Sequence, residues 1–468
     1  MSPGDSAPVD GPEERLSRAS ASRGGTAALL VLVGTSLLAT GIFGLWRDHE
    51  WIAQPFYAWV WWGYILTLDG FVAWRRGDSL LTKRRGFVIP ICLWSVSFWF
   101  LFELVNARIR NWYYVGVYPA DEFAAGAVFT LLAFATVFLG IFETHDALTA
   151  SGLWKGWRGR RRRFPVSLTF VLQGVGLATL AVALLFPRYL APLVWGSFTL
   201  LVDPWNYRRG TRSLLRDFEH GDYGLLARLL TAGLVCGVIW ESANFFAPQK
   251  WIYTVRGLEG FKVFEMPLLG FLGFPALALD SMAAFALMAS LLLGNRTWER
   301  PEDLAYRLDL RRPARRSIRA ASVVAQVGFW LLVSYFATPV NIGSFKLELA
   351  DLGLRAEEVR RLEEAGIERP RQLRRALRDR PDRVRERLGW TAERARVIGD
   401  RVELFTFKGS GSRYGELLER VGVRRPSDLA GGDPLRLHRE IGQQARALGV
   451  RPPRLDFVKV WVGAAEGR

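Results

Sequence analysis

Residues 239–280 read IWESANFFAPQKWIYTVRGLEGFKVFEMPLLGFLGFPALALD and join the end of one apolar run to the middle of the next. Glu241, Glu265 and Asp280 lie within or beside these apolar runs. Placing a carboxylate at membrane depth costs about 2.5–3.5 kcal/mol on insertion scales, so such a residue is a candidate functional group. Glu241 and Asn244 are three residues apart and would share one face of a helix. The stretch predicts a membrane bundle with polar side chains inside it.

Seven further apolar runs lie outside this stretch. The nine candidate spans lie near residues 27–46, 55–74, 86–105, 123–142, 165–187, 189–205, 226–246, 264–292 and 318–338. The run at 189–205 is short, whereas the run at 264–292 is long and contains Pro267 and Pro275. We therefore expect the latter to be broken or re-entrant rather than one straight helix.

Basic residues cluster in the loops that follow the second, fourth, sixth and eighth runs. By the positive-inside rule, this pattern predicts a multi-pass protein of a bacterial inner membrane with a cytoplasmic amino terminus. Residues 1–26 are polar and are expected to form a disordered cytoplasmic tail. Nine spans would place the carboxyl terminus outside, whereas a small Arg-rich domain is more usual in the cytoplasm. The side of the carboxyl-terminal domain therefore stays open.

The membrane part contains an internal duplication whose matches keep their order along the chain. The matched pairs are Trp62 with Trp195, Asp69 with Asp203, Glu103 with Glu241, Asn106 with Asn244, Trp112 with Trp251, Tyr114 with Tyr253 and Glu143 with Asp280. Each unit holds four candidate spans, and an even number of spans returns the chain to the same side. The repeats are therefore predicted to be parallel, with an axis near the membrane normal and binding residues near their interface.

These observations predict an all-α fold. Its membrane bundle would consist of two parallel four-helix repeats, residues 27–146 and 165–293, with an extra transmembrane helix at 318–338. A small soluble helical domain would follow at residues 347–468, where no long apolar run occurs.

The carboxyl-terminal part has a duplication of its own, in which residues 362–370 match residues 418–426. Apolar residues at helical spacing, then Gly and a Pro a few positions later, describe a helix, a turn and another helix. The pattern resembles the tandem helix-hairpin-helix-like domain DUF4332, with Lys408-Gly409-Ser410-Gly411 as its second hairpin. The resemblance implies a fold and no activity.

Gly409 and Gly411 admit two interpretations. A Gly-x-Gly turn can present backbone N–H groups to a phosphate, as in nucleic-acid-binding hairpins. Alternatively, both are turn glycines of a module that docks a protein partner. The Arg residues between 371 and 387 alternate with Asp and Glu, which is typical of a solvated helix face. We therefore favour the docking turn and do not expect nucleic acid as a partner.

The polar residues of the membrane part also admit two interpretations. Glu103 with Asn106, and Glu241 with Asn244, either cap helix ends or converge on a pocket where a carboxyl exchanges a proton and an amide holds a ligand. Four aromatic residues form either an interfacial belt or the wall of that pocket. The candidate pocket residues are Asn106, Asn244, Trp112, Tyr114, Trp251, Tyr253 and Asp280. For Asp69 and Asp203, we expect ion pairs with Arg75 or Arg208.

Part of this pattern resembles the lycopene-cyclase domain of carotenoid enzymes. The resemblance rests on Trp240-Glu241, then Trp251-x-Tyr253, a glycine-containing loop, and Glu265 close to Pro267. It implies a proton-initiated cyclisation without redox change, for which Glu241, Glu265 and Glu103 are the candidate catalytic acids. The family's Pro-x-Glu-Glu stretch is replaced here by Glu265-Met266-Pro267, and the first repeat lacks that part.

No metal or cofactor is expected from the sequence. The four His are not at ligand spacing, and no Walker A, Rossmann or Gly-x-Ser-x-Gly pattern occurs. Three functions stay open: a membrane-anchored binding or scaffold protein, a cofactor-free lipid or isoprenoid enzyme, and a transporter or channel. Whether the protein is an enzyme is undecided. The Trp- and Phe-rich surroundings favour a membrane lipid or an apolar small molecule as ligand, and the carboxyl-terminal domain favours a protein partner.

Overall fold

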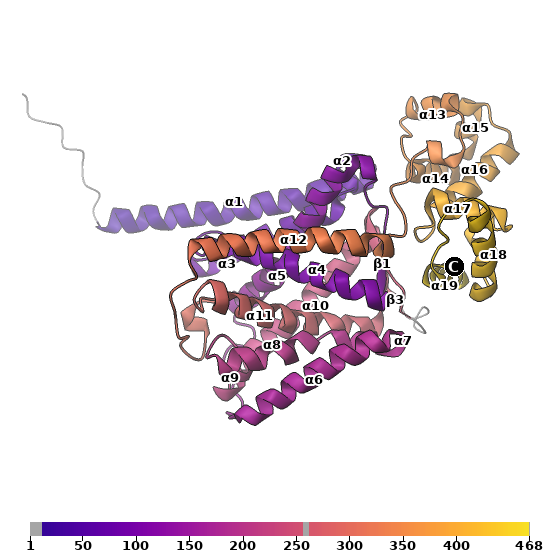
Figure 1. The fold of residues 1–468 in the computed structure, drawn as a ribbon. Helices are drawn as coiled ribbons and strands as arrows, with labels where there is room; N and C mark the ends of the chain where they lie inside the picture. Colours follow the sequence, from indigo (N-terminus) through magenta and orange to yellow (C-terminus); the bar gives the residue numbers. More distant parts are fainter. Residues whose placement is uncertain (1–11, 256–261, 468) are drawn as a thin grey trace, which may run out of the picture.

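The structure is a computed structural model that describes residues 12–255 and 262–467 (Figure 1). Within these residues, seven helices are long and apolar enough to cross a membrane, all between residues 24 and 341. They belong to α1 (Pro12–Arg47), α4 (Val88–Ile109), α5 (Phe123–Ser151), α6 (Val166–Leu185), α10 (Tyr223–Phe246), α11 (Gly273–Leu292) and α12 (Arg316–Asn341). This indicates a multi-pass membrane protein.

Two of the nine predicted spans are not among these seven. The run at 55–74 forms helix α3 (Phe56–Arg76), which is not among the helices that are apolar enough to cross a membrane. The run at 189–205 is split at Gly196, whose φ is +86°, into α7 (Pro187–Leu190), a 3-10 turn and α8 (Ser197–Arg208). With 12 residues, α8 is about 18 Å long, which is shorter than the hydrocarbon core of a bilayer.

Two other sequence predictions can be compared with the observed elements. The run at 264–292 departs from a helix only at its start, where strand β4 (Met266–Pro267) precedes a 3-10 turn; from Leu268 to Leu292 the chain is helical and long enough to cross a membrane. Helix α1 begins at Pro12, within the stretch predicted to be a disordered tail, and residues 1–11 lie outside the described residues. The glycine-containing loop after Tyr253 also falls partly outside them, at residues 256–261.

A short antiparallel ribbon closes one end of the bundle. It pairs β1 (Trp112–Val115), which follows α4, with β2 (Lys250–Tyr253), which follows α10. Trp112 lies opposite Tyr253, and Tyr114 lies opposite Trp251. A second small ladder pairs β3 (Lys262–Val263) with β4. The all-α prediction did not include these strands.

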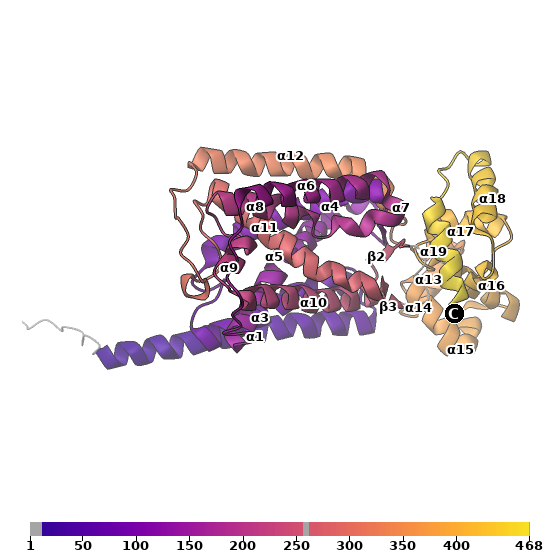
Figure 2. The same cartoon turned by 90° about the horizontal axis from the view of Figure 1, so that it is seen from below.

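A smaller helical domain lies beside the ribbon at that end of the bundle (Figures 1 and 2). Its helices are α13 (Ala356–Glu363), α14 (Pro370–Asp379), α15 (Pro381–Leu388), α16 (Ala392–Phe405), α17 (Gly411–Arg420), α18 (Pro434–Ala447) and α19 (Leu455–Glu466). Its hydrophobic core includes Tyr113, Val115 and Ile252 of the ribbon. The two parts of the chain therefore share one buried apolar cluster.

Candidate functional site

Two asparagines fix the ribbon to the ends of α4 and α10. Asn106 Oδ1 accepts from the backbone N–H of Trp112 at 3.2 Å, and its Nδ2 donates to the Trp112 carbonyl at 3.0 Å. Asn244 makes the same two bonds with Trp251, both at 2.9 Å. A side-chain amide carries both an acceptor oxygen and a donor NH2 group, so it can make the two backbone hydrogen bonds that a neighbouring strand would make. Both amides are thereby engaged with backbone.

Two glutamates lie one helical turn before these asparagines. Glu103 Oε1 accepts from the Tyr114 hydroxyl at 2.7 Å, and Glu103 Oε2 accepts from Asn341 Nδ2 at 2.8 Å. Glu241 Oε1 accepts from the Tyr253 hydroxyl at 2.8 Å. Glu241 is 0% exposed, and its Oε2 has no hydrogen-bond partner among the described residues. Because the Trp112 indole also donates to Glu103, the two carboxyl groups differ by two donors.

The ribbon aromatics reach inward to these carboxyl groups. Trp112 and Tyr253 are buried, whereas Tyr114 and Trp251 are half-buried. Glu103 accepts a hydrogen bond from the Trp112 indole at 3.2 Å, in addition to the one from Tyr114. In the other half, the Trp251 indole donates to the Tyr253 hydroxyl at 2.9 Å. The asparagine bonds turn the two strands back over the helix ends, which brings the aromatic side chains next to the carboxyl groups.

Glu265 lies between two lysines at the same end of the bundle. Its carboxylate accepts from Lys250 Nζ at 3.0 Å and from Lys408 Nζ at 2.6 Å. Burial alone would raise the pKa of Glu265, but the two ammonium groups outweigh burial and hold its pKa below the usual value. An ionised carboxylate between two lysines is suited to fastening Lys408, and unsuited to giving up a proton.

The hairpin between α16 and α17 is seated on the ribbon. The Lys408 carbonyl accepts from the Tyr113 hydroxyl at 2.9 Å and from the Trp461 indole at 3.3 Å. Gly409 has φ +77°, and a Cβ there would collide with the Val115 side chain. Gly411 has φ +62°, and its nearest neighbour for a Cβ is Ser344. Gly409 of the proposed docking turn therefore packs against the ribbon, and Gly411 packs against the segment that connects α12 to this domain.

This domain has a recognisable family model. Residues 352–468 match DUF4332, a domain of unknown function. The search of curated proteins and the search of solved structures found no match. The DUF4332 match gives a boundary for the domain and no activity, and no comparison bears on the membrane part.

A second contact joins the DUF4332 domain to α2 (Glu50–Ala53). Arg369 pairs with Glu50, and Gln372 donates to the Asp48 carbonyl at 3.2 Å. Lys346, in the connecting segment, bridges Glu50 and Glu122 at 2.5 and 2.7 Å. An open hollow of about 370 Å³ lies here, lined by residues 47–51 of the membrane part and by Gly366, Glu368 and Gln372. The predicted intramembrane pocket would lie elsewhere, at Glu103 and Glu241.

Three aspartates of the membrane part hold backbone rather than arginine. Asp280 accepts from the N–H of Gly196 at 2.8 Å and from the N–H and hydroxyl of Thr199 at 2.7 and 2.6 Å, which caps α8. Asp69 accepts from Ser79 Oγ and Leu81 N, and Asp203 accepts from Ser213 Oγ, Leu214 N and Leu215 N. The predicted pairs with Arg75 and Arg208 are not formed; Arg208 donates to Thr169 and Gln173 instead.

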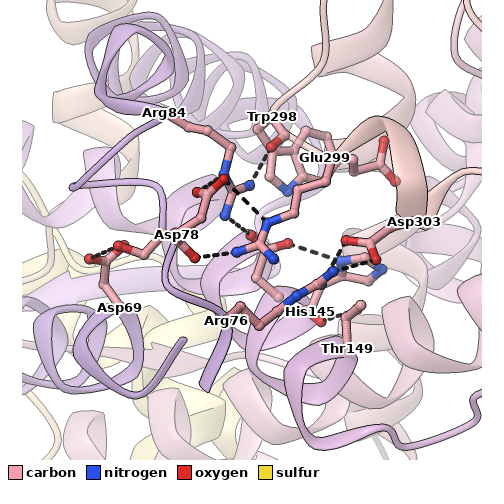
Figure 3. A network of polar contacts seen from close by, with 12 residues as sticks. Asp69, Arg76, Asp78, Arg84, His145, Thr149, Trp298, Glu299 and Asp303 are labelled. Atoms are coloured by element: carbon pink, nitrogen blue, oxygen red, sulfur yellow. Dashed lines mark hydrogen bonds and ion pairs between the residues drawn. The ribbon is translucent and has the colours of Figure 1, made fainter. Parts of the chain in front are cut away.

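Sequence analysis missed a buried ionic network at the opposite end of the bundle (Figure 3). Arg76 pairs with Asp303 at 2.7 Å, and Arg84 pairs with Asp146 at 2.7 Å. Glu299 lies in the same loop as Asp303, at residues 293–315, and pairs with Arg212 at 2.7 Å. The acidic residues of loop 293–315 were the sequence signal for these ion pairs. The positive-inside rule explains the basic residues of a cytoplasmic loop, but it does not explain acidic ones.

Proposed function

We propose that the protein is a membrane-anchored binding protein. Its membrane part would bind a membrane lipid or an apolar small molecule in an intramembrane polar pocket at the ribbon. The DUF4332 domain would cover that end and present its outer faces to a partner protein. The observation that carries the proposal is that two glutamate–tyrosine pairs and the Lys408 hairpin meet on one ribbon.

Glu241 is the part of the ribbon end best suited to a ligand. Leaving a buried acceptor without a donor costs about 1–3 kcal/mol, so a ligand that supplies a hydroxyl or amide N–H would recover that free energy. The surroundings are aromatic: Tyr57 meets Trp251 edge-on at 5.6 Å between ring centroids, and Trp240 lies 4.9 Å from Trp61. A hydrogen-bond donor on an apolar body is complementary to this site.

The duplication is part of the same proposal. The ribbon register is unchanged when the two strands exchange places, because Trp112 pairs with Tyr253 as Tyr114 pairs with Trp251. The asparagine bonds recur in both halves, and so do the bonds of Asp69 and Asp203. These matches support two parallel repeats related by an axis through the ribbon, with the ligand site beside that axis.

We also propose an orientation for the chain. The loop at 152–165 lies at the bundle end opposite the ribbon, and its Arg160–Arg163 run is exposed (Figures 1 and 2). By the positive-inside rule, that end would face the cytoplasm together with the amino terminus. The DUF4332 domain, at the ribbon end, would then lie on the outer side of an inner membrane.

Bound lipid provides the test. Purified wild type and a Glu241→Gln variant would be extracted and their retained amphiphiles quantified by mass spectrometry. We expect about tenfold less of one amphiphile in the variant, because about 1.4 kcal/mol of hydrogen bonding is lost. Glu103→Gln is the matched control: its second oxygen already bonds Asn341, so we expect lower stability and unchanged ligand content. Equal ligand content in wild type and Glu241→Gln would contradict the proposal.

One alternative is a cofactor-free isoprenoid enzyme. It is favoured by the unpartnered oxygen of Glu241 at an aromatic end of the bundle that includes Trp61, Trp240 and Trp251, because aromatic ring faces stabilise cations. Glu265 would hold charge instead of donating a proton. In an assay of the purified protein with linear isoprenoids, a cyclic product that disappears in Glu241→Gln and persists in Lys408→Met would favour this alternative.

A further inference from the structure

Glu143 in α5 is, after Glu241, a second buried carboxyl group with an unpartnered oxygen. It is 1% exposed, and neither of its oxygens has a hydrogen-bond partner within residues 12–255 and 262–467. Asp280 in α11 provides the contrast, because its two oxygens accept three hydrogen bonds from Gly196 and Thr199. The two acids occur at matching places in the chain, and only one of them is satisfied.

The continuity of the facing helix explains the difference. Helix α8 begins at Ser197, so its first turn has free N–H groups that Asp280 can accept. Helix α3 runs unbroken from Phe56 to Arg76, and its interior N–H groups bond carbonyls of the preceding turn. Glu143 therefore meets no free backbone donor on α3. The acidic group on α3 that interacts with Glu143 is the Asp69 carboxyl.

The cations near Glu143 are already engaged. Arg84 pairs with Asp146 at 2.7 Å and with Asp78 at 3.0 Å, and it also donates to the Trp298 carbonyl (Figure 3). His145, on the same helix as Glu143, has its Nδ1 3.6 Å from Asp146. No guanidinium or ammonium group among the described side chains makes an ion pair with Glu143, so its charge would be uncompensated.

A row of hydroxyl and thiol groups continues inward from Glu143. The Tyr64 hydroxyl on α3 lies 2.8 Å from Thr144 Oγ1, and Thr144 Oγ1 lies 3.3 Å from Cys236 Sγ on α10. These groups, with Asp69, Arg84, Asp146 and His145, are the titratable and charged groups around Glu143. Arg84 is the permanent cation among them, and its ion pairs go to Asp146 and Asp78.

We propose that Glu143 is an exchangeable proton-binding site, at which one proton bound to its carboxyl is shared with the Asp69 carboxylate. The proton enters from water at the end that carries the Arg-rich loops and returns there, with no other bond made or broken. One proton removes the repulsion between two facing carboxylates. Within the described residues, no group of three or more His, Cys, Asp and Glu could hold a metal ion, which favours a proton over a divalent cation. This site is independent of any ligand at Glu241.

Carbodiimide labelling tests the proposal, because dicyclohexylcarbodiimide attacks protonated carboxyl groups in apolar surroundings. The full chain in liposomes would be labelled at about pH 5.5 and about pH 8.5 and then digested for peptide mass spectrometry. We expect adducts on Glu143 that decrease severalfold at the higher pH, and none on Asp280. Labelling that is independent of pH, equal on Asp280, or suppressed by sodium chloride would overturn the proton site.

A stability measurement decides the matter if the reagent does not reach Glu143. On unfolding, the chain would release the proton that the folded pair retains, so wild type should lose thermal stability as pH rises. The amide of Glu143→Gln donates to Asp69 at any pH, so this variant should show a flatter profile. Parallel loss of stability in wild type and Glu143→Gln would overturn the proposal.

Discussion

Asp280, Asp203 and Asp69 show how single residues decide local structure in the membrane part, because each carboxylate accepts from backbone N–H groups of a different segment. In Asp280→Asn, the side-chain NH2 group would replace one accepting oxygen and would face the N–H donors of Gly196 or Thr199. We expect the free energy of unfolding to fall by about 1–3 kcal/mol, measured by thermal unfolding in detergent. Ser281→Ala is the control, since that hydroxyl bonds only the Leu277 carbonyl of its own helix. Equal losses in the two variants would contradict the capping role.

Glu358 gives a prediction of pH dependence in the DUF4332 domain. Its carboxylate accepts from the Trp390 indole at 2.7 Å and from the Arg355 N–H at 2.8 Å. Burial would raise its pKa, but these donors and Arg394 lower it from 4.5 to about 2. A lowered pKa means that the stabilisation is present above pH 4.5 and is lost as pH falls toward 2.

The expected size is about 2 kcal/mol, measured as hydrogen exchange of residues 356–363 in the full chain that becomes faster relative to the intrinsic exchange rate at each pH, as pH falls from 4.5 toward 2. Glu358→Gln should show the faster exchange already at neutral pH. Its neighbour Glu357, which is exposed and pairs with Arg361, supplies the matched variant Glu357→Gln. If both variants behaved alike, the bonds of Glu358 would not be the cause.

At the scale of elements, the hairpin and the ribbon should depend on each other. Gly409 and Gly422 both have a left-handed φ, +77° and +89°, so an alanine strains either position by about 1 kcal/mol. Only at Gly409 would the new Cβ meet Val115; at Gly422 the space is open. Gly409→Ala should therefore accelerate hydrogen exchange in residues 112–115, whereas Gly422→Ala should not. Equal exchange in both variants would mean that the hairpin does not hold the ribbon.

Helices and ribbon also differ in how far sequence could predict them. A transmembrane helix satisfies its own backbone and needs only about 20 apolar residues, so most runs were predicted within a few residues. A strand of four residues has no such signature, and the partner of β1 lies more than 130 residues away. The same holds for Lys408 and Glu265, which are 143 residues apart. The residue types at the site were predictable, whereas their bonds depend on long-range packing.

At the scale of the whole molecule, the orientation signal is smaller than the count of basic residues implies. Arg76, Arg84 and Arg212 were counted as loop charges, but each is paired with a carboxylate in the folded chain. Paired charges are a weak guide to the cytoplasmic side. The orientation therefore rests on the basic residues that are exposed at the bundle end opposite the ribbon, namely the Arg160–Arg163 run together with Arg312, Arg315 and Arg316.

Cysteine accessibility tests this orientation directly. Cys92 and Cys236 would first be replaced by serine, and then Arg162→Cys or Arg378→Cys would place one thiol in the exposed Arg loop or on the DUF4332 domain. A membrane-impermeant maleimide added to intact spheroplasts should label Cys at 378 at once and Cys at 162 only after lysis. Short basic loops resist translocation across the membrane, so we expect the Arg160–Arg163 loop on the cytoplasmic side. Labelling at position 162 before lysis and at position 378 only after lysis would put the DUF4332 domain in the cytoplasm. Labelling at both positions before lysis would put the Arg loop outside, against the positive-inside rule.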